Sequence, residues 1–344
     1  MRAIVIHKAK DLRIEERSIV EPSHDEVLVT MATGGICGSD LHYYNHGGIG
    51  DSIRLKEPMI LGHEVAGYVT QIGPSVTHLK EGDLVAVSPS RPCYNCQYCA
   101  RGQLNHCENM RFYGSAMPFP HIQGAFREQL VAKASQCIKA DGLSAGEAAM
   151  AEPSSVCLHA VRRAGELLGK RVLITGSGPI GTLCVLAAKA AGAGEIVITD
   201  LVDRALEFAS SVGADHVINM GSNPDGLKSY QEGKGTFDIL FECSGAAPAL
   251  AEGIKAMRPR GVVMQLGLGG DMNVPVQALT AKELDLRGSF RFHEEFNIAV
   301  DLMQRGVIDV KPLISHTVSL EDAERGFELA MDRSSAMKTQ IAFA

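Results

Sequence analysis

The sequence predicts an α/β protein whose two halves are built differently, and three observations support this fold class. Residues 1 to about 150 hold short β-branched runs separated by glycine and proline turns, a pattern typical of β-rich structure. From about residue 155, apolar strand segments alternate with helical segments, which predicts βαβ units around a doubly wound parallel sheet. A glycine-rich turn joins the first strand and helix of that region, where such sheets bind nucleotides.

The individual elements follow from local patterns of apolar residues. In the first half, the expected strands are residues 2–6, 26–31, 64–73 and 82–88. In the second half, near-continuous apolar runs are typical of strands buried on both faces; these runs are residues 170–176, 195–200, 216–218, 237–245 and 261–267. The expected helices are residues 155–167, 179–193, 203–214 and 297–306, followed by a final helix and strand.

Length and composition limit the possible classes of protein. At about 150 residues per domain, 344 residues suggest about two domains. A net charge of −7 argues against a broad nucleic-acid-binding surface. No apolar run reaches the roughly 18 residues of a membrane helix, so no membrane partner is expected. The N-terminus resembles a strand more than an export signal, and with nine cysteines expected to be reduced, a cytoplasmic protein is predicted.

The strongest local motif is a group of four cysteines with the spacing C-x2-C-x2-C-x7-C. The thiols are Cys93, Cys96, Cys99 and Cys107. Four thiolates suit a closed, tetrahedral and structural zinc site. An iron–sulfur cluster is the alternative, but the last gap of the bacterial ferredoxin motif is shorter and a proline follows it. Disulfides are less in keeping with a chain of this length.

The glycine-rich turn predicts a dinucleotide site of the Rossmann type. Its residues are Gly176, Gly178, Pro179, Ile180 and Gly181. These glycines would permit the tight turn, the approach of a pyrophosphate and close packing of helix on strand. The helix N-terminus would offer its amide groups to the phosphates.

An acidic residue ends the next expected strand, as the Rossmann motif requires. Asp200 lies about twenty positions after the motif, where a carboxylate accepts hydrogen bonds from the adenosine ribose. This favours NAD, because the carboxylate would repel the 2′-phosphate of NADP. Arg204 could soften that repulsion, or it could be a solvated arginine of the next helix.

A third set of residues is scattered along the chain. Cys37, His63, Glu64 and Glu152 offer sulfur, nitrogen and oxygen ligands, a combination typical of catalytic zinc sites. Each is weak evidence by itself, because a lone cysteine is usually a small buried residue. Sequence spacing alone does not bring these residues together.

Several motifs, in the order GICGSDLHYY, LGHEVAGYV, the four-cysteine segment, AEPSSV and GSGPIG, together resemble those of the zinc-dependent medium-chain dehydrogenases. The segments GICGSDLHYYNHGGIG and PMILGHE are similar to the sorbitol dehydrogenase branch. MRFYGSAMPFPHIQGAF and LRGSFRFHEEFNIAV are most similar to L-idonate 5-dehydrogenases. Animal sorbitol dehydrogenases lack a complete set of the four cysteines, which this chain has.

This resemblance implies roles for individual residues. Cys37, His63 and Glu64 match the ligands of a catalytic zinc, and Glu152 matches a nearby acid that contacts the zinc-bound water or enters the shell transiently. Whether Glu64 or Glu152 is the resting third ligand stays open. The remaining matches are a proton relay of Ser39 and His42, polyol-pocket residues Tyr43 and Arg291, and a nicotinamide-side loop of Leu266, Gly267 and Leu268.

The resemblance implies hydride transfer from a secondary alcohol to NAD, with NADP possible, using two zinc ions per subunit. The leading substrate is L-idonate, oxidised at C5 to 5-keto-D-gluconate, and the alternative is a neutral polyol such as sorbitol or xylitol. A sugar acid needs a cationic partner; Arg111 and Arg291 are candidates, although Arg111 could equally belong to a structural ion pair. A remote alternative is a non-catalytic, zinc- and nucleotide-binding regulator.

The pattern and the resemblance together imply the architecture. Residues 1–150 would form a GroES-like catalytic domain with the cysteine lobe at about 90–110. Residues 151–295 would form the Rossmann domain, and 296–344 would return to the catalytic domain. The active site would then lie between the domains. The family also implies a homo-oligomer, either a tetramer or a dimer.

Overall fold

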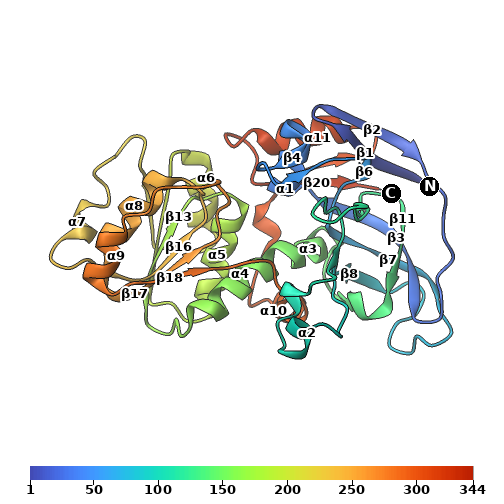
Figure 1. The fold of residues 1–344 in the computed structure, drawn as a ribbon, viewed down its shortest axis with the longest axis horizontal. Helices are drawn as coiled ribbons and strands as arrows, with labels where there is room; N and C mark the ends of the chain where they lie inside the picture. The colour runs from blue at the N-terminus through green and yellow to red at the C-terminus, as the bar shows by residue number, and fades with distance from the viewer. Residues whose placement is uncertain (344) are drawn as a thin grey trace.

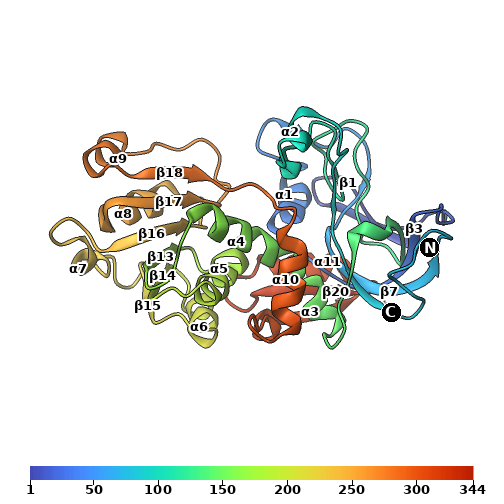
Figure 2. The same cartoon turned by 90° about the horizontal axis from the view of Figure 1, so that it is seen from below.

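Two β-sheet regions lie at opposite ends of the molecule, with helices between them (Figure 1). The coordinates are a computed structural model, and they describe residues 1–343. The helices between the sheets are α3 (Ala145–Ala149), α4 (Ala151–Ala164) and α10 (Glu295–Gln304). Figure 2 gives the same arrangement from below, with α10 crossing between the two parts.

The first part is built on a seven-stranded sheet that joins both ends of the chain. Its order is β12 (Cys137–Lys139), β8 (Leu84–Val87), β7 (Glu64–Ile72), β3 (Glu26–Gly35), β20 (Lys338–Ala342) and β19 (Ile314–Ser319), with β11 (Gln129–Lys133) also pairing with β3. The C-terminal strand β20 lies antiparallel to β3. The C-terminal segment therefore completes a sheet formed by the N-terminal half.

Shorter elements surround this sheet. A second sheet has the order β2 (Asp11–Glu16), β1 (Arg2–Lys8) and β6 (Met59–Ile60). Two small hairpins are β4 (Gly48–Ile49) with β5 (Ile53–Arg54), and β9 (Ser90–Arg91) with β10 (Arg111–Phe112). Helices α1 (Gly38–His46), α2 (Gln97–Ala100) and α11 (Ala323–Met331) accompany the short helices η1 (Leu104–His106), η2 (Ala134–Gln136) and η3 (Lys311–Leu313).

The second part is a parallel sheet of six strands. Its order is β15 (His216–Asn219), β14 (Glu195–Asp200), β13 (Arg171–Thr175), β16 (Phe237–Glu242), β17 (Met257–Gln265) and β18 (Asp285–Gly288). Numbered within the sheet, this is the order 3-2-1-4-5-6 of the doubly wound nucleotide-binding fold. The sequence prediction of an α/β protein with a doubly wound parallel sheet is confirmed.

Helices cover both faces of this parallel sheet. Alternate side chains of β13 face opposite ways, so Val172 and Ile174 belong to one apolar cluster and Leu173 to another. The first cluster includes residues of α4, α5 (Pro179–Ala190) and α6 (Asp203–Ser211); the second includes residues of α8 (Ala247–Ala256) and α9 (Val276–Lys282), near α7 (Lys228–Gln231).

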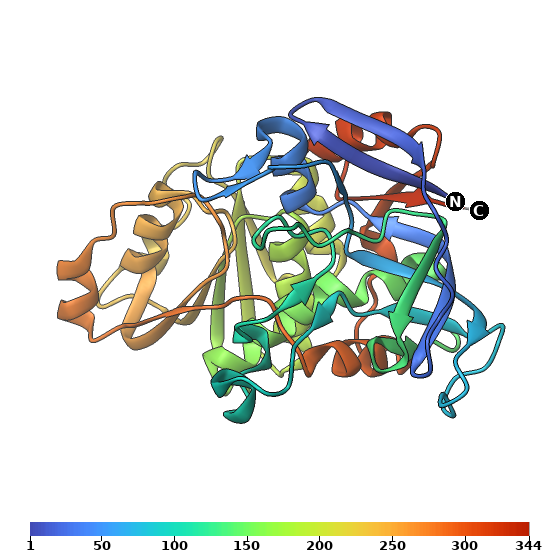
Figure 3. The same cartoon turned by 45° about the vertical axis from the view of Figure 1, so that its right-hand side comes forward.

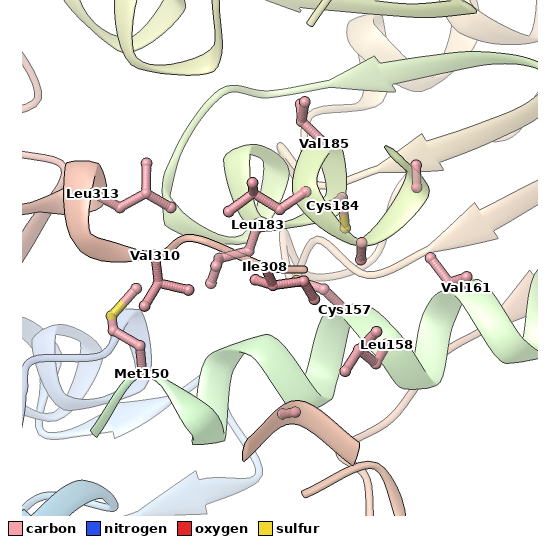
Figure 4. Packing of buried hydrophobic residues seen from close by; sticks show 14 of the residues in the cluster. Met150, Cys157, Leu158, Val161, Leu183, Cys184, Val185, Ile308, Val310 and Leu313 are labelled. Carbon is pink, nitrogen blue, oxygen red and sulfur yellow. The ribbon is translucent and has the colours of Figure 1, made fainter. Parts of the chain in front are cut away.

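The largest apolar cluster continues from one part of the molecule into the other. Figure 4 shows α4 packing against α5 and the segment after α10, with Cys157 and Leu158 near Leu183 and Ile308. The same cluster contains Ala66 and other small residues beside the seven-stranded sheet. Dense packing of this kind fixes the relative position of the elements that carry the sites described below.

The structure differs from the sequence prediction at several helices, because the apolar pattern did not predict α1, α2, α3, α7, α8 or α9. The segment of α1, GSDLHYYNH, has no clear apolar face, and its start is instead fixed by a local hydrogen bond from the Cys37 amide to Asp40 Oδ2 at 3.0 Å. Among residues 1–343, no helix is both long and apolar enough to span a membrane.

Candidate metal and dinucleotide sites

The four cysteines of the motif come together in a small lobe at the edge of the first part. Their Sγ atoms all lie within 4.8 Å of one another. All four are free thiols. The Cys93 amide donates to Cys107 Sγ at 3.2 Å, and hydrogen bonds to the sulfur, the largest from the Asn95 backbone, lower the pKa of Cys93 to about 6. This all-sulfur group fits a structural zinc ion.

The lobe packs against the chain that follows β18. Asn105 Nδ2 donates to the Phe290 carbonyl at 2.9 Å, and the His106 ring stacks on Phe290. Figure 3 shows the lobe in teal beside this orange segment. The lobe thus contacts residues next to Arg291, which belongs to the second candidate site.

Three of the scattered ligand candidates also come together. Cys37 precedes α1, and His63 and Glu64 lie at the start of β7. Strand pairing sets Gly35 of β3 opposite Glu64, which brings the two segments side by side. One ligand atom from each of the three residues lies within 4.8 Å of the others. We call this group the mixed-ligand trio.

Within the trio, His63 and Glu64 are buried and Cys37 is partly buried, and Asp40 positions the surrounding backbone. Asp40 accepts hydrogen bonds from the Cys37 amide and, at 3.2 Å, from the Gly62 amide. Its Oδ1 lies 3.9 Å from His63 Nδ1, which has no hydrogen-bond partner within residues 1–343. Burial raises the pKa of the Cys37 thiol to about 12, and the Glu64 carboxylate raises it further. A thiol, an imidazole and a carboxylate at this separation fit a zinc ion, whose charge would favour the thiolate.

A buried lysine from the C-terminal strand contacts the trio. Lys338 Nζ donates to the two carboxylate oxygens of Glu64 at 2.8 and 2.7 Å. The side chains are 2% and 1% exposed. Burial lowers the pKa of Lys338, but Glu64, Cys37 and Glu152 together raise it, and the net shift is upward. No sequence pattern predicted this contact, because Lys338 is separated from Glu64 by most of the chain.

Glu152 lies near the trio but is not part of it. It is buried at the start of α4, and burial raises its pKa to about 8, with His63 lowering it and Glu64 raising it. Only Glu64 has a carboxylate oxygen within the 4.8 Å group.

The two relay candidates and the pocket candidate Tyr43 all lie on α1, but they are buried to different extents. Ser39 and His42 are partly buried on α1, next to Cys37, and burial lowers the pKa of His42, with His46 adding to the effect. Tyr43 is buried, and its hydroxyl accepts a hydrogen bond from the Ala116 amide at 3.0 Å.

The two arginine candidates lie in different environments. The Arg291 guanidinium lies 4.2 Å from the centre of the Phe112 ring, and that ring contacts His63. Burial lowers the pKa of Arg291 to about 10, although Glu152 and Tyr43 act in the opposite direction. Arg111 is exposed on β10, where it is paired with Arg91 in the hairpin, and no carboxylate within residues 1–343 forms an ion pair with it.

The glycine-rich turn joins β13 to α5. A Cβ on Gly181 would lie 1.8 Å from the Gly176 carbonyl oxygen, and Gly176 has φ +89°. A Cβ on Gly178 would meet nothing within 4 Å. Two glycines are therefore required by the turn and its packing, while the third leaves open space at the helix N-terminus, and this cradle fits the pyrophosphate of a dinucleotide.

Asp200 contacts this turn directly. Its Oδ2 accepts a hydrogen bond from the Ser177 amide at 2.6 Å, and both carboxylate oxygens contact Arg333 Nη2, at 2.9 and 2.7 Å. Arg204 instead pairs with Glu207 at 2.7 Å. Arg333 was missed at the sequence level because it lies in a turn after α11, far from the Rossmann motif.

The predicted nicotinamide-side loop follows β17. Leu266, Gly267 and Leu268 line a cavity of ≈ 460 Å³ together with Phe290 and other residues. The Glu242 carbonyl accepts hydrogen bonds from the Leu266 and Gly267 amides at 2.9 and 2.8 Å. The loop is thereby held at the carboxyl ends of β16 and β17, where ligands bind in such sheets.

Comparison with known proteins identifies two domains and a family. Residues 23–142 match the alcohol dehydrogenase GroES-like domain, and residues 179–305 match the zinc-binding dehydrogenase domain. The chain is 42% identical to the L-idonate 5-dehydrogenase (NAD(P)(+)) of Escherichia coli, over 99% of this chain and 98% of the relative. The chain belongs to the zinc-dependent medium-chain alcohol dehydrogenase family.

Further relatives support this membership of the alcohol dehydrogenase family. The sorbitol dehydrogenase of Gallus gallus is 40% identical, over 95% of this chain and 92% of the relative. The crystal structure of L-idonate 5-dehydrogenase from Escherichia coli matches with a TM-score of 0.95, over 99% of this chain and 98% of that chain, at 42% identity. The predicted family, the pairing of a GroES-like with a Rossmann domain, and the assignment as a zinc- and NAD(P)-dependent oxidoreductase are confirmed.

Proposed function

We propose that this protein oxidises L-idonate at C5 to 5-keto-D-gluconate, with NAD or NADP as the hydride acceptor. The observation that supports an alcohol dehydrogenase most directly is the mixed-ligand trio of Cys37, His63 and Glu64, whose ligand atoms lie within 4.8 Å of one another. The choice of L-idonate rests on the 42% identity, over nearly the whole chain, to a protein with that activity.

The trio would hold one zinc ion and the four-cysteine lobe a second. When bound, zinc would polarise the substrate hydroxyl, and the nicotinamide would supply the hydride-accepting carbon. Ser39 would accept the hydroxyl proton, and His42 would pass it to solvent. The lowered pKa of His42 leaves its imidazole neutral near pH 7 and able to accept that proton.

Arg291 is the better candidate for the substrate carboxylate. Its guanidinium lies over the Phe112 ring, which contacts His63 of the trio, and a guanidinium binds a carboxylate through two parallel hydrogen bonds. Arg111 is exposed on β10, and nothing else in its surroundings supports this role.

The alternative substrate is a neutral polyol such as sorbitol or xylitol. It is favoured by the 40% identity to a sorbitol dehydrogenase over 95% of the chain. The third possibility, a non-catalytic regulator, is less favoured because a regulator has no need of an intact trio, and all three ligand residues are present and close together.

A purified-enzyme assay tests the proposal by following reduced nicotinamide absorbance. L-idonate, gluconate, sorbitol and xylitol are each combined with NAD⁺ and with NADP⁺. We expect the highest kcat/KM with L-idonate. If a neutral polyol is turned over faster than L-idonate, that polyol is the preferred substrate and the assignment to L-idonate is wrong. If the zinc-loaded enzyme turns over none of these alcohols, the result favours the non-catalytic regulator.

The proposal also covers the domain boundaries, the oligomeric state and the cellular compartment of the protein. We assign residues 1–150 to the catalytic domain, 151–295 to the Rossmann domain and 296–344 to the returning segment. We also propose a homo-oligomer, a tetramer or a dimer. The nine free cysteines support the cytoplasm as the compartment, because thiols stay reduced there. Light scattering from the purified enzyme measures the subunit number.

A further inference from the structure

The Asp200 carboxylate is already fully engaged by hydrogen-bond donors. Besides the Ser177 amide, it accepts from the amides of Leu201 at 2.7 Å and Val202 at 3.0 Å. Arg333 Nη2 adds contacts of 2.9 and 2.7 Å to its two oxygens. A carboxylate has about four lone-pair positions, so a ribose hydroxyl can bond to Asp200 only if Arg333 gives up its place.

Arg333 lies where it can change partners. Its side chain is 52% exposed, whereas that of Asp200 is 4% exposed. It lines a cavity of ≈ 190 Å³ together with Ser177, Gly178 and Pro179 of the glycine-rich turn. Because Nη2 alone makes both contacts with Asp200, the Nη1 and Nε donors remain available to another acceptor.

The ion pair also connects the two parts of the molecule. Asp200 ends strand β14 of the parallel sheet, and Arg333 lies between α11 and β20, which belong to the first part. A group bound at the Asp200 end of the cofactor site therefore meets a charge that comes from the other part of the molecule.

The charge of Arg333 alters the choice between the two cofactors. A phosphate at the ribose 2′ position carries close to two negative charges at pH 7, and an unpaired Asp200 would repel it. Arg333 neutralises Asp200 and offers free guanidinium donors, which suit phosphate oxygens. Arg204 is less suitable, since Glu207 holds its Nη1 at 2.7 Å and its guanidinium lies over the Phe208 ring.

We propose that Arg333 is a cofactor-selecting residue: it competes with the ribose hydroxyls of NAD for Asp200 and binds the 2′-phosphate of NADP. Arg333 thereby reduces the preference for NAD over NADP that Asp200 alone would give. This role rests on the proposed function in one respect only, that a nicotinamide dinucleotide binds at the glycine-rich turn. It does not depend on which alcohol is oxidised.

Direct binding measurements test this role without a substrate. The full-length, zinc-loaded enzyme is titrated with NADH and with NADPH, and the fluorescence of the reduced nicotinamide is followed. The chain has no tryptophan, so protein emission does not interfere. The variants are Arg333→Gln, the conservative Arg333→Lys, and Arg204→Ala for the competing candidate. Arg305→Ala, another exposed arginine paired with a carboxylate, is the matched control.

We expect Arg333→Gln to weaken NADPH binding by about tenfold to a hundredfold, the range for lost charge-assisted hydrogen bonds. NADH affinity should stay the same or rise, because the ribose no longer competes with Arg333. Arg333→Lys should recover part of the NADPH affinity, and Arg305→Ala should change neither. A merely structural ion pair would instead weaken both cofactors to the same degree.

Three results would overturn the role of Arg333. These are equal weakening of both cofactors in Arg333→Gln, no change in the ratio of the two affinities, and a loss of NADPH affinity in Arg204→Ala alone. Wild-type enzyme that binds NADH but not NADPH would also refute it. If neither cofactor binds to folded wild-type enzyme, the proposed dehydrogenase function fails as well. Failure of the Arg333 role alone differs from this, because the wild-type enzyme then still binds at least one cofactor.

Discussion

The four-cysteine lobe and the mixed-ligand trio are both groups of candidate metal ligands, but they are assembled in opposite ways. The lobe takes its four thiols from residues 93–107, a single short segment. The trio takes a thiol, an imidazole and a carboxylate from two separate segments, and a lysine from the C-terminal strand contacts it. A local group of one ligand type suits a closed structural site, whereas a mixed group assembled by the fold leaves room for a substrate.

The two groups also differ in what stabilises their negatively charged ligand atoms. The lobe is stabilised by hydrogen bonds from neighbouring amides to its sulfurs. In the trio, Glu64 has a full counter-charge from Lys338, buried to the same extent. Loss of a ligand residue should therefore chiefly affect stability in the lobe and activity in the trio, whereas loss of the buried Lys338 counter-charge should lower stability at the trio. Four substitutions test these differences.

The largest effect is expected for Cys37→Ser. Loss of the thiolate should remove one zinc ion per subunit and lower kcat/KM by at least about a thousandfold, equivalent to roughly 4 kcal/mol of transition-state stabilisation. Metal analysis and the alcohol oxidation assay measure the two effects. A variant that keeps both zinc ions and normal turnover would remove Cys37 from the catalytic site.

Lys338→Met tests the buried counter-charge. Removing one member of a buried ion pair destabilises a protein by about 3–5 kcal/mol, so the free energy of unfolding of the metal-free enzyme should fall by about that much. Denaturant titration of the metal-free protein measures this change. The double variant Lys338→Met with Glu64→Gln is the control, because no unpaired charge then remains, and it should recover most of the loss. Equal destabilisation of the single and double variants would contradict the ion-pair explanation.

Ser39→Ala tests the proton relay beside the trio. The variant should keep both zinc ions, since Ser39 is not one of the three ligand residues. Loss of a positioned proton acceptor should lower kcat by about a hundredfold. Steady-state kinetics and metal analysis on the same preparation measure both quantities. Unchanged kcat would show that the proton leaves by another route.

Cys99→Ser should have the smallest effect on catalysis. It should remove the lobe zinc and lower the free energy of unfolding by roughly 2 kcal/mol, because metal binding and folding of such a lobe are coupled. Turnover at low temperature should stay within about threefold of wild type, since the trio is intact. Thermal unfolding and the same assay provide the comparison with Cys37→Ser. A thousandfold loss of turnover with unchanged stability would reverse the roles of the two sites.

The sequence predicted the fold best where one feature dominated a segment. The apolar runs of β13, β14 and β16 identify buried parallel strands, because such strands have no polar face. Helix α1 was not predicted, because its residues have no apolar periodicity and its start depends on Asp40. This helix holds Ser39 and His42, so the element with the most proposed catalytic residues is the one whose local pattern was weakest.

By itself, the sequence determined the cysteine lobe, the glycine-rich turn and the βαβ units of the parallel sheet. Each of these features depends on residues close together in the chain. Only the tertiary structure decided that Lys338 forms an ion pair with Glu64 and that Arg333 forms one with Asp200. Both basic residues lie in or beside the C-terminal strand β20, which returns to pair with β3. Contacts made by such a return depend on the path of the whole chain, and no local pattern of charge or hydrophobicity encodes them.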